Sequence, residues 1–259
     1  MRLQQLNPSM KALTIVVLVL LLALVFDPIT PLLYGLWTIA ITLLFGQVNL
    51  KKYGLFLIPF FIIAFGMFWT TLVFGEKPVN PDDMVKVFGM TFARESLFTA
   101  LSLGLRVLSF AMLSLLFILT TDPTRFILSL MQQCKLSPKL AYGILAGFRF
   151  LPMMREELKN IRAAHRIRGV GRANGWKESF VQFKRYSIPL LAGAIRKAER
   201  TAIAMESKGF TGDRNRSFYR SFATGKRDWI FLVVMIGMFV LIAFTSWSLG
   251  YFQWYNGEV

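Results

Sequence analysis

The chain has 259 residues, of which 55% are hydrophobic and 25 are Phe, and it carries a formal net charge of +16. Soluble domains are less apolar, and apolar runs of roughly 20 residues match the hydrocarbon thickness of a bilayer, so we expect an integral membrane protein. The single cysteine, Cys134, excludes an internal disulfide and a cysteine-based metal site.

Four apolar segments in the first half of the chain are expected to cross the membrane. The first helix starts at Asn7-Pro8, because Asn can cap exposed amides and Pro is tolerated in a first turn. It runs to Phe26, and no signal-peptide cleavage pattern follows it. The other spans are expected at residues 30–46, 55–74 and about 97–121. A polar loop should join the last two, with Pro78, Pro81, Asp82 and Asp83.

The last apolar segment, residues 229–249, gives a fifth span. Trp229 lies at one end and Trp247, Tyr251 and Trp254 at the other, the aromatic girdle expected where helix ends meet lipid head groups. With the N-terminus in the cytoplasm, 26 of the 30 Lys and Arg residues fall inside and three outside, and Arg106 is left within a span. This asymmetry predicts a cytoplasmic N-terminus.

Residues 122–227 hold 22 of the 30 cations and 7 of the 14 acidic residues. Asp122-Pro123 and Ser137-Pro138 each repeat the cap-then-proline start of a helix, and another helix follows from about Trp176. We expect a cytoplasmic set of amphipathic helices here, between the fourth and the last span. A nucleic-acid partner is not favoured, because the positive-inside rule and attraction to anionic lipid head groups explain the charge.

The two long helices of this block are expected to end alike. One stops at Ile167-Arg168-Gly169 and the other at Ser207-Lys208-Gly209. Gly just past a helix end adopts left-handed geometry at little cost, and a cation there favours the helix dipole. A cation on a rigid helix end can bind carboxylates or free carbonyls in a groove of another protein. We therefore predict that these six residues form two equivalent contact sites for partner proteins.

Residues 140–154 offer an alternative, because a sixth crossing there would place Lys208 and the helix before it outside the cell. Arg149 lies within the segment, which is also short. These features, and the loss of charge asymmetry, disfavour the sixth crossing.

Residues suited to catalysis are scarce. The only histidine, His165, lies in a run of arginines, and no Gly-rich loop ending in Lys-Ser/Thr is present to bind ATP.

Asp27 stands at a turn and is expected to cap a helix. Arg106 is the one charge well inside a span, where a functional role is the default hypothesis, but structural pairing is favoured over substrate contact. The sequence does not show its partner.

Four short segments of this sequence match a protein family in order and spacing. They are Thr120-Thr121-Asp122-Pro123, Gly147 to Pro152 followed by Glu156-Glu157, Arg168-Gly169, and Ala204 to Phe210. On these segments, the chain from about residue 95 to 212 resembles the transmembrane T component of energy-coupling factor transporters, which are ABC importers. The earlier spans fit in pattern only.

The resemblance implies a non-catalytic coupling subunit, without a cofactor of its own, in the plasma membrane of a prokaryote. Its partners would be the lipid bilayer, two ABC ATPase subunits with ATP and Mg, and one S component that captures a vitamin, a vitamin precursor or a metal ion. Each helix tip, which reads Ala-Arg-Gly in that family, would enter a groove of one ATPase subunit. Here Ile167 replaces the first Ala and Ser207-Lys208 replace Ala-Arg, so the second contact is expected to be weaker.

We therefore expect an all-α membrane protein in three parts: transmembrane helices in 1–121, a cytoplasmic coupling-helix domain in 122–227, and a last span and tail in 228–259. Two rival functions are a stand-alone permease with a path near Arg106 and a membrane-bound enzyme acting on lipids. The enzyme would need clustered acids or a nucleophile and base, which we do not find in the sequence.

Overall fold

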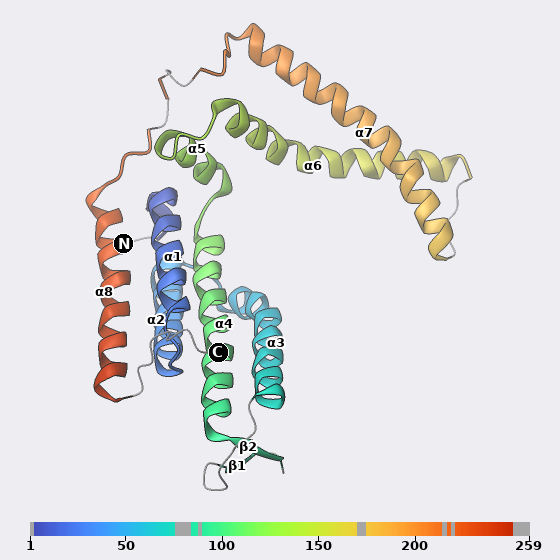
Figure 1. Ribbon diagram of the computed structural model, residues 1–259. Helices are drawn as coiled ribbons and strands as arrows, with labels where there is room; N and C mark the ends of the chain where they lie inside the picture. Colours follow the sequence, from blue (N-terminus) through green and yellow to red (C-terminus); the bar gives the residue numbers. More distant parts are fainter. Residues whose placement is uncertain are drawn as a thin grey trace. The chain divides into compact units, whose positions relative to one another are not determined.

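The computed structural model describes residues 3–75, 84–87, 90–169, 175–213, 217–218 and 221–250. Most of these residues are helical, and four helices are long and apolar enough to cross a membrane, which confirms the expected all-α membrane protein. The chain forms two compact units, one of Met1–Ser129 with Phe222–Val259 and the other of Leu130–Ser221 (Figure 1). The second unit is thus an insertion in the sequence of the first.

The first unit, which we call the membrane unit, holds most of the apolar helices. Its helical elements are η1 Leu3–Gln5, α1 Pro8–Ala23, α2 Ile29–Gly46, α3 Leu50–Phe74, α4 Arg94–Thr120 and α8 Lys226–Ser248. The four candidate spans are in α2, α3, α4 and α8, whereas α1 has only 16 residues. The protein is therefore multi-pass, and a fifth crossing by α1 stays a prediction. Residues 140–154 are not among the candidate spans found in the described part of the chain.

A small β-hairpin precedes α4 where the sequence suggested only a polar loop. Strands β1 Met84–Val87 and β2 Met90–Ala93 pair antiparallel, with Met84 opposite Ala93 and Val87 opposite Met90. Two valines in β1 favour extended backbone, a local signal that the polar residues before it obscured. The predicted loop residues Pro78, Pro81, Asp82 and Asp83, and the aromatic residues Tyr251 and Trp254, lie outside the described residues.

The core of the membrane unit joins helices from both ends of the chain. Leu18, Leu22, Leu113 and Leu116 are fully buried together with residues of α8. Tyr34 on α2 donates a hydrogen bond to the carbonyl of Met235 on α8 at 3.3 Å, and its ring meets Phe239 edge-on at 5.7 Å. In contrast, α3 packs mainly on α4 and leaves most of its apolar side chains exposed.

The inserted unit is built on two long helices, α6 Pro138–Ile167 and α7 Trp176–Ser207. The boundary between the two units, after Ser129, falls within α5 Pro123–Gln133. α6 and α7 run antiparallel (Figure 1): Tyr142 near the start of α6 meets Phe210 just past α7, and His165 near the end of α6 meets Tyr186 of α7. α5 and α6 begin at the predicted prolines, Pro123 and Pro138, because a Pro in the first turn loses no helical hydrogen bond.

Candidate functional site

Both long helices end at the predicted cation-Gly pairs. Arg168 is the C-terminal cap of α6, and Gly169 after it has a φ of +80°. Lys208 caps α7 in the same way, and Gly209 has a φ of +81°. The amides of the two glycines donate to carbonyls of the last turns at 3.0 and 2.9 Å. The expected left-handed glycines are therefore confirmed at both tips.

All six residues of the two tips are exposed, and the side chain of Ile167 is among the most exposed apolar groups, at 88%. Within the described residues, the side chains of Arg168 and Lys208 make no hydrogen bond and no ion pair. An unpaired cation next to the free carbonyls of a helix end is ready to bind an acidic or carbonyl-lined groove.

The antiparallel arrangement of α6 and α7 separates the two tips. The ring of Tyr142 contacts Phe210, two residues past Lys208, at 5.4 Å, whereas the ring of His165, three residues before Arg168, contacts Tyr186 at 5.3 Å. The rise of an α-helix between these two contacts on α6 is about 35 Å. The structure therefore does not bring the predicted site residues together but places them at opposite ends of one helix pair.

Two polar contacts join the described residues of α6 and α7. Lys197 and Glu157 form a half-exposed ion pair at 3.5 Å, and the guanidinium of Arg162 lies over the ring of Tyr186 at 5.9 Å. Exposed pairs of this kind contribute at most about 1 kcal/mol each. The distance between the two tips is set by the length of the two helices, which have 30 and 32 residues.

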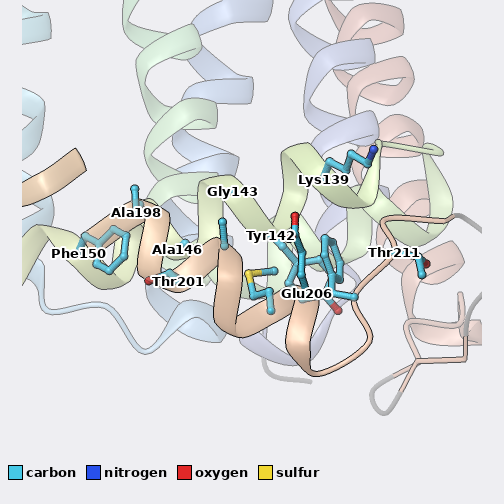
Figure 2. A pocket seen from close by; sticks show the side chains of 13 residues that line it. Lys139, Tyr142, Gly143, Ala146, Phe150, Ala198, Thr201, Glu206 and Thr211 are labelled. Carbon is cyan, nitrogen blue, oxygen red and sulfur yellow. The ribbon is translucent and has the colours of Figure 1, made fainter. Parts of the chain in front are cut away.

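A groove of about 530 Å³ lies between α6 and α7 toward the Lys208 tip (Figure 2). Its walls combine large side chains, such as Tyr142 and Phe150, with small residues. The small residues include Gly143, Ala146 and Gly147 of α6 and Ala198 and Ala202 of α7. A Cβ added at Gly143 or Gly147 would meet nothing within 4 Å. Contacts inside this chain therefore do not require glycine there, and the groove has room for a partner's side chains.

Arg106, whose partner the sequence did not show, binds the turn between α1 and α2. It is 8% exposed, donates from Nη2 to the carbonyl of Val25, and its guanidinium lies 4.2 Å from the centre of the Phe26 ring. Two serines of α4 support the same turn, because Ser102 donates to the carbonyl of Asp27 at 3.2 Å and Ser109 to that of Pro31. These contacts fit the structural pairing that the sequence analysis favoured.

Asp27 acts as the expected helix cap and also reaches the last helix. Its Oδ2 accepts bonds from the amide and the hydroxyl of Thr30, at 3.0 and 2.7 Å, and from the hydroxyl of Ser246 on α8. The carboxylate is only 1% exposed. Since Ser246 is 219 residues away, no local pattern could have pointed to it.

A second buried polar cluster was missed from the sequence. Lys11, counted there as one of the cytoplasmic cations, is 1% exposed, and its ammonium binds residues at the end of α4. The only hint was a lysine placed inside an apolar helix. Among the described residues, no three His, Cys, Asp or Glu side chains are grouped to hold a metal ion.

Alanine at Gly169 is expected to fray the end of α6. The left-handed backbone costs a residue with a Cβ about 1–2 kcal/mol, although the Cβ itself would meet nothing within 4 Å. Hydrogen exchange of the amides of residues 166–168 should therefore accelerate by roughly 5- to 30-fold. Gly143→Ala is the matched control on the same helix, since its Cβ has equal space and its backbone is helical. Equal exchange in both variants would contradict the preference for glycine at the end of α6.

The sequence has relatives among transport proteins. The family model of CbiQ, described as a cobalt transport protein, matches residues 2–219, a range that includes both helix tips. A relative from Acidaminococcus fermentans is 29% identical over 168 residues, which cover 62% of this chain and 63% of the relative. A relative from Bacillus subtilis is 27% identical over 93% of this chain and 92% of its own length. A relative from Limosilactobacillus fermentum is 27% identical over 92% of this chain and 91% of its own length. All three are named energy-coupling factor transporter transmembrane protein EcfT.

Proposed function

Because the chain belongs to the CbiQ family and is the transmembrane component of an energy-coupling factor transporter, we propose that α6 and α7 are its coupling helices. In this role the chain is a non-catalytic subunit. ATP and Mg bind to partner ATPase subunits, whose closure moves the two helix tips.

One observation carries the proposal, namely two exposed cation-Gly tips at opposite ends of one antiparallel helix pair. A separation of about 35 Å along α6 lets two protein subunits each bind one tip without competing for space. Arg168 presents a planar fork of donors, whereas Lys208 presents a single rounded ammonium. The unequal tips favour two different ATPase subunits over two identical ones.

The membrane side of the mechanism requires a separate S component that captures the substrate. We assign its contacts to the exposed surfaces of the coupling helices, including the groove of Figure 2, and to the apolar face of α3. The charge asymmetry supports a cytoplasmic position for the N-terminus and for α6 and α7. The substrate class is a micronutrient, either a vitamin, a vitamin precursor or a metal ion.

Purification of the chain alone and together with its ATPase and S-component partners tests the proposal. We expect no substrate binding by the chain alone, and ATP-dependent uptake only when all components are reconstituted in liposomes. Substrate binding or turnover by the isolated chain would favour a permease or an enzyme and would overturn the proposal.

A further inference from the structure

The inserted unit is joined to the membrane unit at two crossings of the chain. The first crossing follows Ser129, and the second precedes Phe222. The backbone at these two points is the covalent route by which movement of the coupling helices reaches the membrane unit. If the crossings were free loops, they would absorb that movement.

A buried lysine fixes the junction between α4 and α5, ahead of the first crossing. The ammonium of Lys11 donates to the carbonyl of Thr120 at 3.2 Å and to the hydroxyls of Thr120 and Thr121 at 3.1 and 3.3 Å. A further bond, at 2.8 Å, goes to the carbonyl of Leu3. A cation at this position satisfies free carbonyls and compensates the negative end of the helix dipole.

The first turns of α5 are held by the same N-terminal segment. The hydroxyl of Ser129 donates to Oδ1 of Asn7 at 2.8 Å and also shares a hydrogen bond with the hydroxyl of Ser9. Arg125 donates to the carbonyl of Gln4 at 2.9 Å. The N-terminal segment therefore binds both sides of the junction between α4 and α5, up to Ser129, the last residue before the first crossing.

The return crossing meets the same residues. Asp228, in the first turn of α8, accepts from the backbone amide of Asn7 at 2.7 Å and from that of Gly225 at 2.8 Å. The guanidinium of Arg125 also lies 6.0 Å from the ring of Phe222, the first residue after the inserted unit. Asn7 is thus bonded to Ser129, the last residue before the first crossing, and to Asp228, six residues after the second crossing begins. The carboxylate of Asp228 is buried.

We propose that residues 3–11 form a clamp that holds the two crossings as one rigid group, so that movement of the coupling helices is transmitted to the membrane helices. This inference rests on the proposed function. Its physical basis is the cost of breaking a buried network, since each donor or acceptor left unpaired costs about 1–3 kcal/mol. Lys11, Asn7 and Asp228 are positioning residues in this clamp.

Lys11→Met tests the clamp, because Met fills a similar space without the ammonium. In the complete transporter reconstituted in liposomes, ATP hydrolysis and substrate uptake are measured in the same sample. We expect the ATPase subunits to remain bound and to hydrolyse ATP, while uptake per ATP falls at least tenfold. Lys52→Met, at an exposed lysine in the first turn of α3, is the control and should leave the ratio unchanged. Unchanged uptake per ATP in Lys11→Met would overturn the clamp.

A reversible disulfide gives a second test, which decides the question if Lys11→Met fails to assemble. The hydroxyls of Ser9 and Ser129 touch, so Ser9→Cys with Ser129→Cys, in a Cys134→Ser background, should form a disulfide on oxidation. A clamp that stays closed predicts uptake per ATP in the oxidised form equal to or above that of the reduced form. Loss of uptake on oxidation with continued ATP hydrolysis would show that the junction must open, and would overturn the inference.

These outcomes are separable from failure of the proposed function. If the unaltered chain does not bind ATPase subunits, the coupling role itself is wrong. If it binds them and supports uptake, and Lys11→Met does the same with an unchanged ratio, only the clamp is wrong.

Discussion

Replacing Arg168 by alanine is expected to weaken the binding of one ATPase subunit by at least about 30-fold and to reduce uptake sharply. Removing one partner of a buried charge contact at an interface costs about 2–5 kcal/mol, and the lower value corresponds to this factor. Lys208→Ala should have a smaller effect, because an ammonium lacks the planar fork of a guanidinium. The measurement is quantitative co-purification of each ATPase subunit, together with uptake in liposomes.

The matched control for Arg168→Ala is Lys159→Ala. Lys159 is an exposed cation on α6 whose only ion pair in the described part of the chain is with Glu156, at 2.8 Å. Its removal keeps the tip intact and should change subunit binding little. Full transport by the double variant Arg168→Ala/Lys208→Ala would remove the coupling mechanism, because both tips would then be dispensable.

Arg106→Met is expected to destabilise the membrane unit by about 3 kcal/mol, because the buried carbonyl of Val25 loses its donor and the Phe26 ring loses the cation on its face. For a chain of this size, that loss lowers the melting temperature by roughly 6–12 °C. Thermal unfolding of the purified chain in detergent, followed by tryptophan fluorescence, provides the measurement.

Arg149→Met serves as the control for Arg106→Met, since Arg149 is an exposed arginine on α6 and its loss should leave the melting temperature unchanged. The same pair of variants separates the two roles of Arg106. An unchanged melting temperature with lost uptake in Arg106→Met would indicate a substrate contact, as the permease alternative requires. A lower melting temperature supports the structural pairing to the turn after α1.

The ends of the helices were predictable because their signals are local. Asn7 caps α1 through a bond from the amide of Ser9 at 3.1 Å, as expected from the Asn-Pro pair. Gly169 and Gly209 mark the C-terminal ends of α6 and α7 in the same local way, because glycine adopts the left-handed backbone that ends a helix. One local signal was overlooked: Asn49 caps α3 through the amide of Lys51, so α3 begins at Leu50 rather than at residue 55.

The buried polar contacts were not predictable, since their partners are distant in sequence. Lys11 binds Thr120, 109 residues away, and Arg106 binds Val25, 81 residues back. The sequence alone predicts that Lys11 is a cytoplasmic surface charge and that the chain leaves the membrane at the end of α4 without a bound partner. The packing of α1 against α4 turns the same lysine into a buried donor. Such pairings appear only when the tertiary contacts are known.

The pairing of the first helices with the last one has a consequence for biosynthesis. Asn7 binds Asp228, Asp27 binds Ser246 and Tyr34 binds Met235, across 221, 219 and 201 residues. A ribosome needs about 10–40 s to add that many residues, so these three bonds form only after α8 has been synthesised. A chain truncated before α8 would lack all three bonds, and we expect such a fragment to be less stable than the whole chain.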